Sequence, residues 1–257
     1  MPLILSNTTG TGNLSLIASG GSGNLGLSVA PTPTIITTGL ILNLDATNAS
    51  SYPGTGTTWT DLSGQTNTGT LVGSPTYTSS PGYLTFASGK SVTTALSNIT
   101  LNGKATFIAW VYSTQTQQSY TGVIFNRTGY GGSTAAATGL DLYSSNSVGY
   151  HWRDLAATYN WNSGLITPNN EWAMIAVSVG GTEATAYLCK SSGITSATNT
   201  TNHASVSGLN FYIAVDPADP TRRTFVGGIA IAMIYNEALS AEDVLTNFNV
   251  QKSRFGL

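Results

Sequence analysis

Alternating apolar and polar positions recur in short segments along the chain and predict an all-β protein. Clusters of Gly, Asn, Ser or Pro separate these segments, as in a two-layer β-sandwich. Within the segment 104–112, the alternation directs Phe107 and Val111 toward the core between the sheets, and Trp172 begins another core strand. The predicted strands cover residues 40–45, 83–87, 104–112, 121–126, 139–143, 148–152, 172–179, 183–188, 209–215 and 229–234.

The last of these strands is apolar on both faces, so it is predicted to lie inside the two-layer body. Strict alternation would place Ile229, Ile231 and Met233 on one face of the strand. Ala230, Ala232 and Ile234 would then lie on the other face.

A short amphipathic helix is predicted directly after this strand. Ser240 is the expected N-cap, and Asp243 has the spacing of an acidic capping box. Leu239 and Val244 have the spacing of a hydrophobic staple. The apolar face would consist of Val244, Leu245 and Phe248, with Lys252 and Arg254 near the C-terminal end, where cations are favoured.

Residues 1–38 differ from the rest of the chain and are predicted to form an N-terminal arm. The pattern Gly-Asn-Leu-x-Leu occurs twice, at 12–16 and 23–27, and each copy predicts a short strand. A Pro/Thr connector follows. The alternatives are a flexible tail and an assembly arm that packs on a neighbouring chain. The second is favoured because four leucines would otherwise be exposed: Leu14, Leu16, Leu25 and Leu27.

The closing segment GGIAIAMIYNEALSAEDV resembles the end of laminin-G-like domains of the concanavalin A-like lectin/glucanase superfamily. YLTFASGKSV, ATFIAWVY and EWAMIAVSVGG resemble earlier strands of the same domains, in the same order. The opening block GLILNLDATNASSYPG and the ending RFG resemble those domains as found in bacteriophage structural proteins. The resemblance implies a jelly-roll β-sandwich with a short C-terminal helix over residues 39–257.

Charged residues make up only 8% of the chain, against about a quarter in average proteins. The net charge of −2 offers no attraction to nucleic acid. No apolar run is long enough for membrane insertion. The N-terminal stretch lacks the basic residues of a secretory signal. Cys189 is the single cysteine and excludes an intrachain disulfide; it is expected to be a small buried apolar residue.

The residues present argue against catalysis. In the glucanase relatives, the carboxylates come from one strand with Glu-x-Asp-x-Glu, whereas no such pattern surrounds the four glutamates here: Glu171, Glu183, Glu237 and Glu242. No Gly-x-Ser-x-Gly elbow occurs either. His203 is expected on a surface loop, and His151 as a structural histidine rather than a base. We therefore expect a protein that is not an enzyme.

One aromatic and polar cluster is a candidate ligand site, because flat aromatic faces beside donors and acceptors suit sugar or protein contact. Ordinary core and rim aromatics are the alternative. The candidate residues are Tyr150, His151, Trp152, Arg153, Asp154, Tyr159 and Trp161.

No metal or other cofactor is expected, although the resemblance leaves calcium possible through Asp141, Asp216 or Asp219. Aspartates beside proline or glycine more often form turns, the role also expected for Asp45 and Asp61.

These features together predict a non-enzymatic structural protein of a bacteriophage virion. It would decorate the capsid or belong to a tail or fibre, with other virion proteins and copies of itself as partners. The alternative is an extracellular lectin or adhesin that binds a surface glycan.

Overall fold

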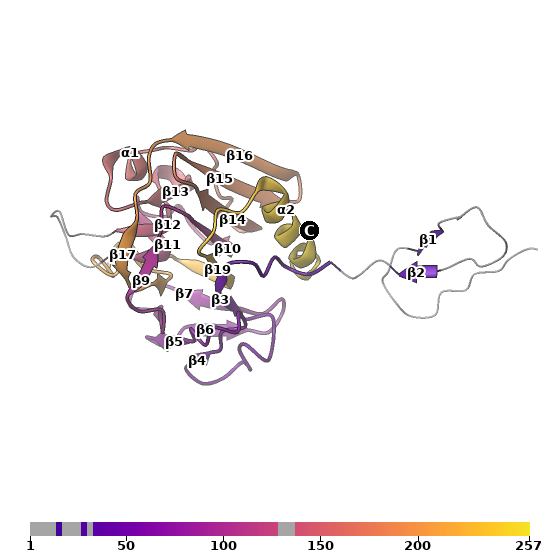
Figure 1. The fold of residues 1–257 in the computed structure, drawn as a ribbon. Coiled ribbons are helices and arrows are strands. Elements are labelled where there is room, and N and C mark those ends of the chain that lie inside the picture. The colour runs from indigo at the N-terminus through magenta and orange to yellow at the C-terminus, as the bar shows by residue number, and fades with distance from the viewer. Residues whose placement is uncertain (1–13, 17–26, 30–32, 128–136) are drawn as a thin grey trace, which may run out of the picture.

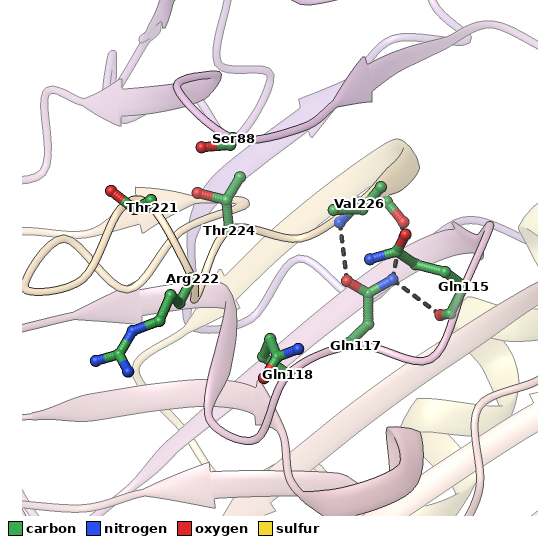
Figure 2. A pocket seen from close by; sticks show the side chains of 8 residues that line it. All are labelled: Ser88, Gln115, Gln117, Gln118, Thr221, Arg222, Thr224 and Val226. Carbon is green, nitrogen blue, oxygen red and sulfur yellow. Dashed lines mark hydrogen bonds between the residues drawn. The ribbon is translucent and has the colours of Figure 1, made fainter.

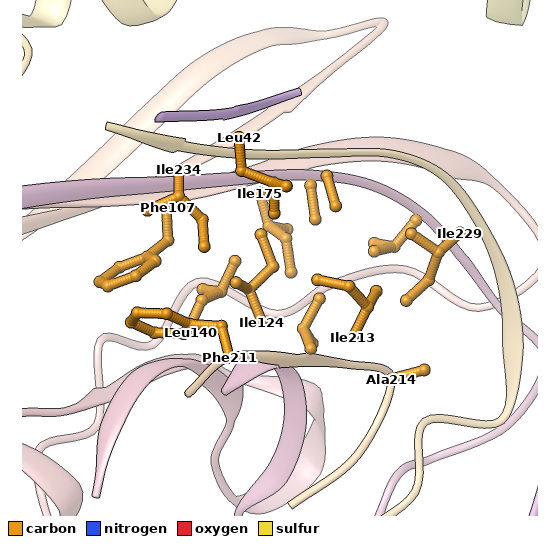
Figure 3. Packing of buried hydrophobic residues seen from close by; sticks show 14 of the residues in the cluster. Leu42, Phe107, Ile124, Leu140, Ile175, Phe211, Ile213, Ala214, Ile229 and Ile234 are labelled. Atoms are coloured by element: carbon orange, nitrogen blue, oxygen red, sulfur yellow. The ribbon is translucent and has the colours of Figure 1, made fainter. Parts of the chain in front are cut away.

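Two antiparallel β-sheets lie face to face in the computed structural model, with apolar side chains packed between them (Figures 1 and 3). The structure describes residues 14–16, 27–29, 33–127 and 137–257. Among these residues, no helix is long and apolar enough to cross a membrane.

The first sheet has the order β16-β15-β14-β10-β19-β7-β6, and β3 also pairs with β19. Its strands are β3 (Leu40–Asp45), β6 (Thr76–Thr78), β7 (Tyr83–Phe86), β10 (Ala105–Ser113), β14 (Trp172–Val179), β15 (Glu183–Lys190), β16 (Gly193–Thr200) and β19 (Gly227–Tyr235).

The second sheet has the order β13-β12-β11-β18-β8-β5-β4. Its strands are β4 (Thr58–Trp59), β5 (Gly69–Val72), β8 (Ser91–Thr94), β11 (Thr121–Asn126), β12 (Thr138–Leu142), β13 (Val148–His151) and β18 (Tyr212–Ile213). Smaller elements are the pair β1 (Leu14–Leu16) and β2 (Leu27–Val29), the pair β9 (Ile99–Leu101) and β17 (Val206–Leu209), the helices α1 (Ala156–Tyr159) and α2 (Ala241–Gln251), and the 3₁₀ turns η1 (Ser144–Asn146) and η2 (Lys252–Phe255).

The core between the sheets confirms the predicted inward face of β10. Phe107 and Val111 are fully buried there, and Phe107 packs on Phe211 with ring centroids 5.6 Å apart (Figure 3). Trp172 departs from its prediction. It is only half-buried and packs in a second apolar cluster on the outer face of the first sheet, against Phe255.

A β-bulge in β19 changes the predicted alternation of the closing strand. Trp110 pairs with Ile231 and Val111 with Ile229, so Ala230 is an extra residue on the β19 side. Ile229 therefore faces the core between the sheets, whereas Ile231 and Met233 face the second cluster. The prediction that these three isoleucine and methionine side chains share one face is wrong at Ile229.

The predicted start of the C-terminal helix is confirmed. The Asp243 amide donates to Ser240 Oγ over 3.1 Å, and the Ser240 amide donates to Asp243 Oδ2 over 3.0 Å. Leu239 and Val244 are both buried in the second cluster, as a hydrophobic staple requires.

The predicted apolar face of α2 is wrong at Leu245, which is 38% exposed. Asn247 and Gln251 are buried instead. Asn247 Nδ2 donates to Tyr235 Oη over 3.1 Å, and its Oδ1 accepts from the amide of Ile36 over 2.8 Å. These polar residues let the helix lie on the sheet because each finds a hydrogen-bond partner there.

The first of the two strands predicted in the N-terminal segment is confirmed as β1, whereas β2 begins only at Leu27, the last residue of the second predicted strand. β1 pairs with β2, with Leu14 opposite Val29 and Leu16 opposite Leu27, whereas Leu25 lies outside the described residues. Ile35 and Ile36 already pack against the second cluster of the body. The contact with the sandwich thus begins inside the segment 1–38.

Asp61 and Asp45 have the turn roles expected of them. Asp61 accepts from the amides of Asn43 (2.8 Å), Ser63 (2.9 Å) and Asn67 (2.8 Å). Asp45 accepts from the Thr47 amide over 2.9 Å and pairs with Arg254 over 2.6 Å. Cys189 is buried as expected, and burial raises the pKa of its thiol to about 12.

Candidate ligand-binding site

A polar pocket of about 320 Å³ lies at the ends of the strands, where three connections meet (Figure 2). Ser88 comes from the β7–β8 turn. The β10–β11 connection and the β18–β19 connection supply the other lining residues, which are Gln115, Gln117, Gln118, Thr221, Arg222, Thr224 and Val226. Amides and hydroxyls dominate this lining.

Gln117 fixes the pocket wall through its buried side chain. Its Nε2 donates to the carbonyl of Val226 over 2.8 Å, and its Oε1 accepts from the amide of Val226 over 2.9 Å. This side chain therefore acts as a strand partner for the start of β19. Its neighbours Gln115 and Gln118 are exposed, and no described residue hydrogen-bonds to their side-chain amides (Figure 2).

A buried charge network holds the β18–β19 connection in place. Both carboxylate oxygens of Asp216 lie 3.1 Å from Arg127 Nε, and Arg223 Nη1 lies 2.9 Å from Asp216 Oδ2. Further along the connection, Arg222 pairs with Asp219 over 2.7 Å. Hydrogen bonds from Arg222 lower the pKa of the Asp219 carboxyl.

Three half-buried tyrosines, Tyr120, Tyr143 and Tyr159, form a cluster that we name the tyrosine patch. The Tyr120 ring centroid lies 5.5 Å from that of Tyr143 and 6.2 Å from that of Tyr159. Tyr120 follows Gln118 by two residues, and the Arg223 guanidinium lies 5.1 Å from the Tyr120 ring. The tyrosine patch therefore adjoins the pocket.

Strand alternation divides the predicted ligand cluster between the two faces of β13. Tyr150 and Trp152 point into the core between the sheets, where Tyr150 Oη lies 2.9 Å from His203 Nε2 and Trp152 Nε1 donates to the Ala204 carbonyl over 2.8 Å. Burial raises the pKa of the Tyr150 hydroxyl. Trp161 is half-buried and packs against the same core. These three residues contribute to the core rather than to an open surface.

His151 and Tyr159 lie on the other side, with their rings stacked 5.4 Å apart. His151 is buried, and its Nε2 lies 3.3 Å from Arg127 Nη2. Because an arginine only donates hydrogen bonds, this nitrogen accepts and the ring proton resides on Nδ1. Arg153 is exposed, and Asp154 Oδ1 lies 3.4 Å from Arg127 Nη1.

Asp141 lies beneath this cluster and is 1% exposed. Its Oδ2 is 3.0 Å from His151 Nδ1, but the angle of approach is not that of a hydrogen bond. Asp141 thus lies beside His151, whereas Asp216 pairs with Arg127 and Arg223, and Asp219 pairs with Arg222. In the described part of the chain, no three His, Cys, Asp or Glu side chains come together as metal ligands.

The prediction that His203 lies on a surface loop is wrong, because the side chain is 4% exposed. Its Nδ1 lies 2.7 Å from the Gly180 carbonyl and donates to it, so Nε2 accepts from the Tyr150 hydroxyl. Desolvation lowers the pKa of His203, and the hydrogen bond to Gly180 partly offsets this shift.

Sequence reasoning singled out the segment 216–223, which supplies Thr221 and Arg222 to the pocket, but only as a weak calcium candidate. It did not identify the other pocket residues or most of the tyrosine patch. Gln115, Gln118 and Tyr120 belong to a connection without a motif, and Ser88 is distant in sequence. Only the meeting of the three connections makes them a site.

The two-sheet architecture is that of a lectin-like β-sandwich. The polar pocket at the ends of its strands is called the rim pocket below. Residues 86–245 match the family Laminin_G_3, described as the concanavalin A-like lectin/glucanases superfamily. This match covers more than half of the 257 residues, so the chain belongs to this family. A search of the curated proteins finds no match to the sequence.

Solved structures share the fold at low sequence identity. Domain 4 of a GH43 extracellular arabinanase from Geobacillus stearothermophilus, in complex with arabinotriose, is 16% identical with a TM-score of 0.56, covering 82% of this chain and 97% of that one. Trypanosoma rangeli sialidase in complex with sialic acid is 13% identical with a TM-score of 0.58, covering 84% of this chain and 33% of the sialidase. The chain thus spans about a third of the sialidase length. A GH54 α-L-arabinofuranosidase is 8% identical with a TM-score of 0.55, covering 77% and 51%.

These similarities contradict the expectation of a protein that is not an enzyme. The three structures compared above come from an arabinanase, a sialidase and an arabinofuranosidase, which are glycosidases. The missing Glu-x-Asp-x-Glu pattern argues only against one arrangement of carboxylates on one strand. It does not exclude an enzyme, and that expectation is withdrawn.

Proposed function

We propose that this protein binds carbohydrate through the rim pocket and the adjoining tyrosine patch. The observation that carries the proposal is the pair of exposed amides of Gln115 and Gln118 in a pocket that Ser88, Thr221 and Thr224 also line with hydroxyl groups. Sugar hydroxyls both donate and accept, and amides and hydroxyls complement both roles. The tyrosine patch offers aromatic faces that pack on sugar C–H groups. The sugar-bound arabinanase domain of similar fold supports the same ligand class.

The pocket favours a short, uncharged saccharide. The positive charge of Arg222 is balanced by Asp219, and that of Arg223 by Asp216, so neither guanidinium is an isolated charge facing a ligand carboxylate. The volume of about 320 Å³ is at the small end for ligand pockets, which suits one or two sugar units.

Replacing both glutamines, Gln115→Ala with Gln118→Ala, is expected to weaken glycan binding roughly tenfold, because each lost hydrogen bond contributes about 0.5–1.5 kcal/mol. A glycan array would identify the ligand, and titration calorimetry would measure the affinity. Gln65→Ala alters an exposed glutamine in a different loop and should bind like the wild type. Wild-type affinity of the double variant, or no binding across neutral glycans, would contradict the proposal.

We also propose display on a bacteriophage virion, with residues 1–38 as the attachment arm. The resemblance of the opening and closing segments to phage structural proteins supports this proposal, as does the charge-poor chain. Other virion proteins and copies of this chain would be its partners. Secretion to the extracellular space as an adhesin is the competing proposal.

Deleting residues 1–32 should abolish incorporation into particles while leaving the thermal stability of the body unchanged. The deletion ends before Ile35 and Ile36, which pack against the body, so the second cluster stays intact. Deleting 1–38 instead removes these two isoleucines and should also lower the Tm. Co-purification of each form with particles, beside its melting curve, separates the two effects. Normal incorporation of the shorter deletion would reject the arm.

A further inference from the structure

A buried amide network holds the β10–β11 connection in place, and its centre is Asn146 in the β12–β13 turn. Asn146 is 2% exposed, and its Oδ1 accepts from the amide of Gln117 over 2.6 Å. Its Nδ2 donates to the carbonyl of Gln115 over 3.3 Å and to Asn169 Oδ1 over 2.8 Å. One side chain therefore fixes the backbone on both sides of Thr116.

The carbonyl of Gln115 is the point where this network meets the pocket. Ser113 Oγ lies 2.7 Å from this carbonyl, and Gln117 Nε2 lies 3.2 Å from it (Figure 2). The backbone of Gln115 is thus held from inside the protein, whereas its exposed side-chain amide lines the pocket. A binding residue on a backbone that is already fixed loses less conformational freedom when the ligand arrives.

The turn that carries Asn146 also carries part of the tyrosine patch. Tyr143 belongs to the patch and directly precedes η1, and its amide donates to the Ser147 carbonyl over 2.7 Å. Ser145 and Asn146 both have left-handed backbone, with φ of 58° and 63°. Asparagine tolerates this conformation and also supplies both a donor and an acceptor. The closed turn therefore connects the tyrosine patch to the wall of the pocket.

We propose that Asn146 is a positioning residue that holds the rim pocket in register with the tyrosine patch, so that the two surfaces take one di- or trisaccharide spanning both. The pocket suits one or two sugar units, and the adjoining aromatic faces extend the surface along the same ligand. Asn146 is buried and does not line the pocket, so it acts through Gln115 and Gln117. This inference rests on the proposed carbohydrate ligand.

Asn146→Gly is the direct test, because glycine keeps the left-handed backbone and removes only the side chain. The probes are arabinotriose, present in the complex of the arabinanase domain of similar fold, and the single sugar arabinose. In titration calorimetry, the wild type should bind arabinotriose more tightly than arabinose. The variant should lose affinity for arabinotriose roughly tenfold and for arabinose much less, because only the longer ligand needs both surfaces in register. A role confined to stability would leave the ratio of the two affinities unchanged.

Hydrogen exchange of the ligand-free protein tests the network without a sugar. The amide of Gln117 should exchange roughly tenfold faster in Asn146→Gly, since it loses its acceptor. Asn146→Asp is the milder variant, because it keeps the oxygen that faces this amide and loses only the Nδ2 donor. It should exchange like the wild type at Gln117 and still bind arabinotriose more weakly. Ser144→Ala changes an exposed side chain of the same turn and should match the wild type in both measurements.

An unchanged ratio of affinities, or exchange of the Gln117 amide in Asn146→Gly as slow as in the wild type, would overturn the inference. A wild type that binds neither sugar would contradict the proposed function and the spanning ligand with it. Faster exchange in Asn146→Gly would in that case still identify Asn146 as the residue that fixes the pocket wall.

Discussion

Trp110→Ala should lower the free energy of unfolding by about 3–5 kcal/mol, the cost of emptying a large buried aromatic site. Trp110 lies on the outer face of β10, with its ring stacked 4.1 Å from Phe255 and 5.5 Å from Phe248. Its Nε1 donates to Gln251 over 2.6 Å. One side chain therefore attaches α2 and η2 to the sheet. Its loss would leave a cavity and a buried amide oxygen without this donor.

Equilibrium denaturation in urea would measure the effect. Trp110→Phe retains an aromatic ring but not the N–H, so it should cost less than the alanine and should isolate the hydrogen bond to Gln251. Leu245→Ala, on the exposed side of the same helix, should change stability by less than about 0.5 kcal/mol. A Trp110→Ala variant as stable as Leu245→Ala would show that the stacked cluster does not hold the helix.

Arg127→Met should cost about 3–5 kcal/mol, because it removes one partner from a buried ion pair and leaves the other charge undercompensated. Asp216 is fully buried and is contacted by both Arg127 and Arg223. Arg127 also lies near Asp154 and His151. Because Asp216 lies in the β18–β19 connection that lines the pocket, the variant should weaken ligand binding together with stability.

A double-mutant cycle separates the pair from its surroundings. Asp216→Asn in the Arg127→Met background removes the buried carboxylate that Arg223 alone would then compensate, so the double variant should be more stable than the sum of the two single changes predicts. Arg222→Met is the stability control, since the Arg222 side chain is 75% exposed and solvent screens its charge. Additive single effects at Arg127 and Asp216 would show that the two side chains are not coupled.

The local sequence patterns predicted many of the strands and the C-terminal helix. β10, β11 and β14 lie within a residue of their predicted limits, and the capping box at Ser240 forms as predicted. Period-two alternation and a side-chain cap each depend on a few neighbouring residues, so both can be recognised from the sequence alone. Short strands such as β4, β6 and β8 escaped prediction because two to four residues give too little periodicity.

The strand β16 was not predicted, for a different reason. Its sequence GITSATNT is mostly polar and gives no apolar stripe, yet it forms a strand because β15 offers a free edge of matching length. The hydrogen bonds to β15, rather than burial, determine its conformation.

The bulge at Ala230 shows the same dependence on a partner. A strand that is apolar on both faces can take either register, and the pairing with β10 selects which isoleucine enters the core.

The amino-acid sequence alone determined the class of this protein: an all-β sandwich with one capped C-terminal helix and a charge-poor surface. Alternation, capping and composition can be read from the sequence without knowledge of the tertiary contacts. The tertiary structure decided which residues form a site. It directed Tyr150 and Trp152 into the core, paired Arg127 with Asp216 across 89 residues of chain, and brought Ser88 to Gln118 and Thr221. A pocket arises where separate connections meet, and no short-range pattern encodes that meeting.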